Sequence, residues 1–235
     1  MEWIEALPQH ATPRVASGTS EVQWLNRAAA LETSKDWQGL RALAERWIKA
    51  QPRRAIAWGV LGEADGNLGQ YAKAIEADRQ ALQINPQYAD AWYNLGIDSD
   101  HAGQYAQAIA AYRQALRINP KFAKAWDNLG NAYGHAVQLA QAIAAFRQAL
   151  QINPQDADAW YNLGNAYYHA GQYAQAIDAY RQALQINPQD ADVWMDLGLA
   201  YMQAGQQNQA LAVYQHLKTL DPAKAQKLFD RIVPK

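Results

Sequence analysis

The stretch Ala157–Asp190 reads ADAWYNLGNAYYHAGQYAQAIDAYRQALQINPQD and decides the fold. Its first half places apolar residues at i, i+3, i+4 and i+7, the spacing of one helix face. These residues are Trp160, Leu163, Gly164 and Tyr167. Gly171 then supplies a residue suited to the left-handed end of a helix. A second helical pattern follows and stops at Pro188, because proline cannot donate the next helical hydrogen bond. The stretch therefore predicts a helical hairpin.

The same slots recur every 34 residues, so the chain is built from copies of this hairpin. We number each copy from its first alanine, which places the tryptophan at position 4. The tryptophans are Trp58, Trp92, Trp126, Trp160 and Trp194, and the closing prolines are Pro86, Pro120, Pro154, Pro188 and Pro222. One hairpin cannot bury both of its faces, so the copies are expected to stack on one another.

This unbroken period and its Trp-x2-Leu-Gly pattern resemble the tetratricopeptide repeat (TPR) family over residues 55–222. The resemblance implies an all-α fold, a right-handed α-solenoid of stacked helical hairpins. We predict an N-terminal extension or linker at 1–20, a degenerate N-capping repeat at 21–54 and five full repeats at 55–222. A C-terminal capping helix and tail follow at 223–235. The N-capping repeat keeps the period, since Trp24 lies 34 residues before Trp58.

Composition restricts the functional classes. The net charge is −1 and there are no cysteines, which argues against nucleic-acid partners, disulfides and thiolate chemistry. No apolar run approaches the length of a membrane span, so we expect a cytoplasmic protein without a membrane partner. We expect mostly a monomer, with end-to-end self-association as an alternative. Several departures from the repeat pattern cluster at one junction, which would also suit deliberate engineering or selection on a regular repeat scaffold.

The resemblance further implies that positions 2, 5, 6, 9, 12 and 13 line a concave groove. The candidate peptide-binding residues are Tyr93, Asn94, Asp127, Asn128, Asn131, Tyr161, Asn162, Asn165, Tyr168, His101, His135 and His169. An amide both donates and accepts, so a row of asparagines is suited to hold a peptide backbone. The alternative, that asparagine is simply a common consensus residue at position 6, stays open.

The groove positions also predict the chemistry of the partner. They carry many carboxylates and tyrosines against a single Lys124, which favours a basic or neutral segment. Related chaperone-adaptor repeats hold an acidic tail with a lysine at position 5. Here position 5 is Gly59, Tyr93, Asp127, Tyr161 and Met195, so that clamp is missing. For the three histidines at position 13 we favour solvated side chains over a shared metal, whose ligands would have to converge on one ion.

One junction departs from the pattern. Interior slots filled elsewhere by tyrosine, phenylalanine or alanine hold Asp65, Asp78, Asp98 and Ser99. We expect these residues to meet between the first two full repeats, where unpaired buried carboxylates would be costly. One hypothesis is a pocket for a cation: an amine, a guanidinium or a hard metal such as Ca²⁺. The other is a hydrated junction without ligand. Both stay open, and apart from that cation we expect no cofactor.

The leading prediction is therefore a non-enzymatic scaffold that binds a peptide segment of a partner protein in the concave groove. The alternative is a receptor for a small cation, amine or metal at the acidic junction. The sequence contains no nucleophile–base constellation, phosphate-binding loop or established metal motif, which argues against an enzyme.

Overall fold

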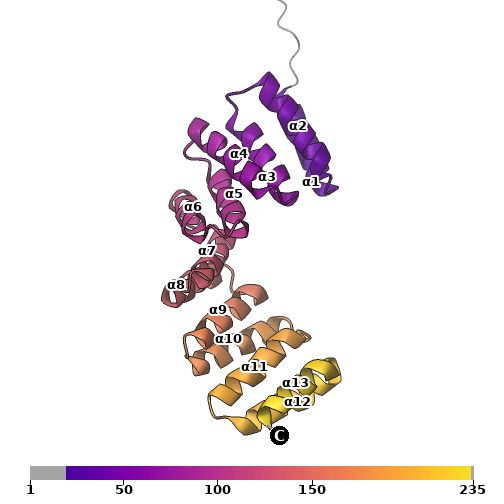
Figure 1. The fold of residues 1–235 in the computed structure, drawn as a ribbon, viewed down its shortest axis with the longest axis vertical. Coiled ribbons are helices and arrows are strands. Elements are labelled where there is room, and N and C mark those ends of the chain that lie inside the picture. Colours follow the sequence, from indigo (N-terminus) through magenta and orange to yellow (C-terminus); the bar gives the residue numbers. More distant parts are fainter. Residues whose placement is uncertain (1–19, 234–235) are drawn as a thin grey trace, which may run out of the picture.

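The computed structural model describes residues 20–233, which fold into thirteen α-helices stacked as antiparallel pairs along one long axis (Figure 1). The helices are α1 (Glu21–Thr33), α2 (Trp37–Ala50), α3 (Ala55–Asn67), α4 (Tyr71–Ile84), α5 (Ala89–His101), α6 (Tyr105–Ile118), α7 (Ala123–His135), α8 (Leu139–Ile152), α9 (Ala157–His169), α10 (Tyr173–Ile186), α11 (Ala191–Gln203), α12 (Gln207–Leu220) and α13 (Pro222–Ile232). The predicted all-α solenoid of hairpins is confirmed. Of the predicted linker 1–20, only Ser20 lies within the described residues, and its side chain caps α1.

The repeated Trp and Pro are explained by one hydrogen bond that joins successive repeats. The indole Nε1 of Trp92 donates to the backbone carbonyl of Pro86 across 2.9 Å, and Trp160 donates to Pro154 across 2.9 Å. The same bond forms from Trp58, Trp126 and Trp194 to the prolines six residues before them. The indole thereby satisfies a carbonyl at the end of one hairpin while it packs in the next.

The turn inside each hairpin requires a residue in the left-handed region. Gly69, Gly103, Gly171 and Gly205 occupy it with φ between 71° and 73°. Val137 holds the same position in the third repeat with φ 57°, and Lys35 holds it in the first hairpin with φ 55°. Glycine adopts this conformation without steric cost, whereas a β-branched residue is strained there. Val137 thus forms the expected turn despite its side chain, which is 78% exposed.

Within three of the hairpins an aromatic ring packs directly on a glycine of the first helix. The rings of Tyr112, Phe146 and Tyr180 lie against Gly96, Gly130 and Gly164, where a Cβ would overlap with them. In the α3–α4 hairpin the carboxylate of Asp78 takes the place of the ring against Gly62.

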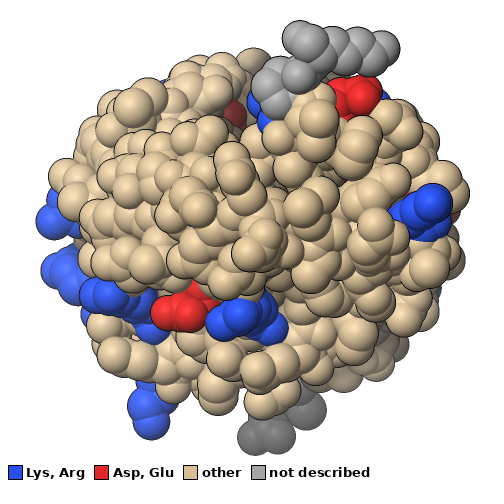
Figure 2. Space-filling model, turned by 90° about the horizontal axis from the view of Figure 1, so that it is seen from below, with Lys and Arg blue, Asp and Glu red and all other residues tan. Residues whose placement is uncertain are grey.

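The two ends of the stack are closed by different devices. At the N-terminal end, Trp24 of α1 stacks on Trp47 of α2 with ring centroids 5.7 Å apart. At the C-terminal end, Asp221 caps α13, which packs on both α11 and α12 and buries Leu228 completely. Viewed onto that end, the surface is mostly uncharged and basic side chains lie around its rim (Figure 2).

Among residues 20–233, no helix is both long and apolar enough to cross a membrane.

Candidate functional site

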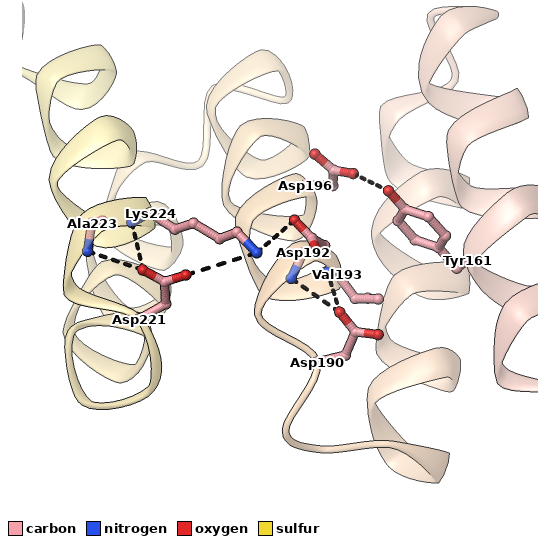
Figure 3. Close-up of polar contacts among 8 residues, drawn as sticks. All are labelled: Tyr161, Asp190, Asp192, Val193, Asp196, Asp221, Ala223 and Lys224. Carbon is pink, nitrogen blue, oxygen red and sulfur yellow. Dashed lines mark hydrogen bonds and ion pairs between the residues drawn. The ribbon is translucent and has the colours of Figure 1, made fainter.

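The predicted groove residues lie on the first helices of the full repeats, α3, α5, α7, α9 and α11. We call the side chains at positions 2, 5, 6, 9, 12 and 13 of these helices the groove face. Here position 5 of one repeat bonds position 6 of the next. Tyr93 Oη accepts from Asn128 Nδ2 across 3.1 Å. The equivalent hydroxyl of Tyr161 donates to Asp196 Oδ2 across 2.8 Å (Figure 3). These bonds fix the orientation of the groove side chains.

Asp127 occupies position 5 between those two tyrosines and takes part in the same row. Its carboxylate accepts from Asn162 of the next repeat at 3.5 Å and from Asn131, one turn along α7, at 3.4 Å. Burial raises the pKa of Asp127 to about 6, and the two amides act in the opposite direction. Asp127 is therefore a partly desolvated hydrogen-bond acceptor. The side-chain amides of Asn162 and Asn131 that donate to it can still form further hydrogen bonds.

The remaining groove asparagines and Tyr168 are also half-buried. Asn165 accepts a 2.7 Å bond from the hydroxyl of Tyr180, so it connects the groove face to the hairpin interior. Asn94 lines a cavity between α3 and α5. Tyr168 stacks edge-on with Tyr173 at the end of α9.

The three histidines are exposed and each has its own aromatic neighbour. His101 stacks on Tyr71 with centroids 5.0 Å apart and planes at 14°. His135 lies 5.1 Å from the ring of Tyr105, and His169 contacts Tyr168. His135 Nδ1 also lies 3.1 Å from a carboxylate oxygen of Asp100 on the preceding groove helix.

At the C-terminal end of the groove face, α13 supplies a cation. The Nζ of Lys224 lies 2.7 Å from Asp192 and 3.8 Å from Asp221 (Figure 3). Asp190 next to them caps the first turn of α11 by accepting from the backbone N–H groups of Asp192 and Val193. The charge of Asp192 is thereby balanced within the chain.

The residues of the acidic junction lie between α3, α4 and α5, the helices of the first full repeat and the first helix of the second. Asp65, Asp78, Asp98 and Ser99 are 3%, 0%, 3% and 0% exposed. Ser99 is satisfied, since its hydroxyl accepts from Gln107, which in turn accepts from Arg79. The Oδ1 of Asp65 lies 3.0 Å from the Nε of Arg41, so the two side chains form an ion pair. The N–H of Arg41 does not point at this oxygen well enough to make a hydrogen bond.

Among residues 20–233, no cation compensates the other two carboxylates of the junction, Asp78 and Asp98. Both oxygens of Asp78 are buried without a hydrogen-bond partner among the described residues. Burial raises the pKa of Asp78 well above its ordinary value, and the charges of Asp98 and Glu63 raise it further. Burial also raises the pKa of Asp98 to about 7, with Asp65 adding to it, and that of Glu63 to about 7. Near neutrality Asp98 and Glu63 therefore exchange protons with the solvent, and an entering cation would favour their ionised forms.

Sequence reasoning missed two features near the candidate residues. Arg41 takes the slot that holds Ile75 and Ile109 in later repeats, and counting back 34 residues from Ile75 would have found it. A cavity of about 550 Å³ beside Gly134 was also missed, although glycine inside a helix is a signal. In the part of the chain that the structure describes, no group of three or more His, Asp or Glu side chains is arranged to hold a metal.

Comparison with known sequences gives a family match over most of the chain. The family described as "TPR repeat" matches residues 62–97, 102–135, 138–171 and 164–205, and "Tetratricopeptide repeat" matches 191–224. No curated protein matches the chain.

Several solved structures are similar. MamA is 26% identical with a TM-score of 0.68, over 73% of this chain and 94% of MamA. PilW, a type IV pilus biogenesis factor, is 23% identical with a TM-score of 0.77, over 89% and 99% of the two chains. YrrB, titled a TPR protein with an unusual peptide-binding site, is 19% identical with a TM-score of 0.70, over 78% and 96%.

Proposed function

Because the chain belongs to the tetratricopeptide repeat family, whose members are typically protein–protein interaction scaffolds, we propose that it is a non-enzymatic scaffold. Its groove face binds an extended peptide segment of a partner protein. The observation that carries this proposal is the row of bonded side chains that crosses three successive repeat boundaries, from Tyr93 to Asp196.

This row is suited to a peptide backbone for a physical reason. The side chains are held in place before binding, so little conformational entropy is lost when a ligand arrives. Asn128 and Asn162 each use an amide N–H within the row, and each amide has both donor and acceptor capacity left for a peptide group.

The charge of the groove face favours a basic or neutral segment. The carboxylates at its positions 2, 5, 6, 9 and 12 are Asp90, Asp158, Asp127, Asp196, Glu63 and Asp100, against one lysine at these positions, Lys124. Asp192 is left out because Lys224 balances its charge. Opposite charge on the partner would accelerate encounter and select against acidic segments.

The proposal is tested by selecting peptides from a displayed random library against the full chain and measuring their affinities by calorimetry. Asn128→Ala/Asn162→Ala is expected to weaken the selected peptides at least tenfold. The matched control is Gln148→Ala/Gln182→Ala on α8 and α10, which removes two exposed amides from second helices of the hairpins and should leave the affinity unchanged. Equal loss in both variants, or selection of no peptide, would contradict a groove-face site.

The alternative function, a receptor for a small free cation, is favoured by one observation, the unpaired carboxylate of Asp78. Because that carboxylate interacts with Asp98 and Glu63, which line a cavity on the groove face, the acidic junction is better treated as part of the peptide site.

A further inference from the structure

Two cavities open on the groove face at the same place in the repeat. The first, about 340 Å³, lies between α3 and α5 beside Gly66, and we call it the Gly66 pocket. The second, about 550 Å³, lies between α7 and α9 beside Gly134, and we call it the Gly134 pocket. Each is lined by positions 12 and 13 of one repeat and by positions 6, 9 and 13 of the next.

Both pockets exist because position 12 is glycine. The other repeats carry Asp100, Tyr168 and Met202 at that position. Gly66 and Gly134 lie inside helices and do not have positive φ, so the backbone does not require glycine there. A Cβ on Gly134 would meet nothing within 4 Å. Glycine inside a helix lowers stability by about 0.5–1 kcal/mol relative to alanine. We therefore infer that these glycines are useful for the open space that they leave on the groove face.

The Gly66 pocket is built to receive a positive charge. Asp98 and Glu63 line it, and the Oδ1 of Asp98 points at the place where Gly66 has no Cβ. Asp78 does not line the pocket, but it is fully buried with both oxygens unpaired and lies close enough to Asp98 for the two charges to interact. Arg41 is engaged with Asp65, and no cation acts on Asp78 or Asp98 within residues 20–233. The stacked rings of Tyr71 and His101 form a wall, and an aromatic face of this kind suits a planar guanidinium.

The Gly134 pocket has the opposite chemistry. Its floor consists of Phe146, Ala166 and Leu139, and no carboxylate lines it. The amides of Asn162 and Asn165 lie at its polar side. An apolar floor under a polar edge is typical of a pocket that buries an apolar side chain while the peptide backbone is held outside.

We propose that the groove face recognises a bipartite peptide, in which an arginine or lysine enters the Gly66 pocket and a leucine- or phenylalanine-sized side chain enters the Gly134 pocket. This inference rests on the proposed peptide-binding function and names the class of ligand. The pockets lie two repeats apart, and neighbouring groove helices packed ~10 Å apart give a separation of ~20 Å. An extended peptide rises ~3.3 Å per residue, so the two anchors are ~6 residues apart in sequence.

The experiment uses synthetic twelve-residue peptides of alternating Ser and Thr that carry one arginine and one leucine. The separation of the two anchors runs from two to nine residues, in both orders, and binding to the full chain is measured by fluorescence anisotropy. We expect the tightest binding at a separation near six, in one order. Replacing either anchor with serine should weaken that peptide at least tenfold.

Two variants restore residues found elsewhere in the repeats. Asp98→Ala introduces the alanine of Ala132 and Ala166, and Gly134→Tyr introduces the tyrosine of Tyr168. Asp98→Ala is expected to abolish only the gain in affinity that arginine gives over serine. Gly134→Tyr is expected to abolish only the gain in affinity that leucine gives over serine. Thermal unfolding of both variants is the control for folding. Neither variant should have a lower unfolding temperature than the parent protein.

The outcomes separate this inference from the function beneath it. If library-selected peptides bind the groove face but show no dependence on Asp98 or Gly134, the bipartite inference is overturned and the scaffold function stands. If neither selected nor synthetic peptides bind, both fail. If arginine methyl ester binds as tightly as the best peptide, the Gly66 pocket is a small-amine receptor and the inference is also overturned.

Discussion

The guanidinium of Arg41 on α2 pairs with the carboxylate of Asp65 on α3, with Nε 3.0 Å from Oδ1. Arg41 occupies the repeat position that holds Ile75 in the next copy, and Asp65 occupies the position that holds Tyr133 two copies later. The charges of these two departures from the pattern therefore compensate each other across a repeat boundary. The pair joins the N-terminal hairpin to the first full repeat, and it neutralises one member of the acidic junction.

Arg41→Ile is therefore expected to destabilise the chain, although isoleucine is the residue of the pattern. It leaves Asp65, whose side chain is 4% exposed, without its cation. Breaking a fully buried pair costs ~3–5 kcal/mol, and because Arg41 is about one-third exposed we expect about 1–2 kcal/mol. Urea unfolding of Arg41→Ile, Asp65→Tyr and the double variant measures the coupling. A double variant as unstable as Arg41→Ile would show that the pair does not explain the loss.

Asp78→Phe should stabilise the chain, because it replaces an unpaired buried carboxyl with the ring that Phe146 supplies two repeats later. An unsatisfied buried polar group costs about 1–3 kcal/mol, and we expect a gain in this range. Asp78→Leu is the smaller companion variant. A loss of stability in both would mean that the slot against Gly62 does not accommodate an apolar side chain.

The gain from Asp78→Phe should also depend on pH. Since the pKa of Asp78 is raised in the folded chain, the folded state holds its proton more tightly than the unfolded state. The stabilisation that this gives the parent is fully present below the unfolded pKa and is lost as pH rises through the folded pKa. The advantage of Asp78→Phe over the parent should therefore grow from pH 4 upward, as followed by urea unfolding at several pH values. A constant difference would contradict a raised pKa.

Binding of an arginine-bearing peptide should tighten between pH 6 and pH 8. The pKa of Asp98 is raised to about 7, so its carboxyl is mostly protonated at pH 6 and mostly ionised at pH 8. A cation binds the ionised form, and its binding releases a proton that calorimetry in two buffers detects. The other titratable groups around the pocket are Glu63, Asp65, Asp78, Tyr71 and His101. Asp98→Ala should flatten the pH dependence, and an unchanged profile in that variant would assign it to another of these groups.

Val137→Gly should stabilise the third repeat. Four glycines hold the same turn position with φ 71–73°, whereas Val137 is forced to φ 57° with an exposed side chain. A residue with a Cβ in the left-handed region destabilises the folded chain by ~1–2 kcal/mol. Glycine removes this strain but also increases the conformational entropy of the unfolded chain, which offsets part of the gain. We therefore expect a net stabilisation of about 1 kcal/mol. Gly171→Val, the reverse change in the fourth repeat, should cost a similar amount. Equal unfolding midpoints for all three proteins would disprove strain at this turn.

The sequence was sufficient for the hairpins and for the buried junction, because both follow from a period that can be counted. The Trp–Pro spacing marks each boundary between repeats, and Asp65, Asp78 and Asp98 stand in slots that are apolar elsewhere. The bonds from Tyr93 to Asn128 and from Tyr161 to Asp196 could not be predicted, because they depend on how far one repeat is rotated on the next. The Gly134 pocket was missed for another reason: the absence of a side chain shows its effect only when the neighbouring helix is in place.

The location of the bound peptide tests the central claim most directly. A library-selected peptide that carries one benzophenone side chain is cross-linked to the full chain, and the modified residues are identified by mass spectrometry. We predict adducts on the groove helices α3, α5, α7, α9 and α11, with those on α5, α7 and α9 strongest. Adducts confined to α4, α6, α8 and α10, the second helices of the hairpins, would contradict the account.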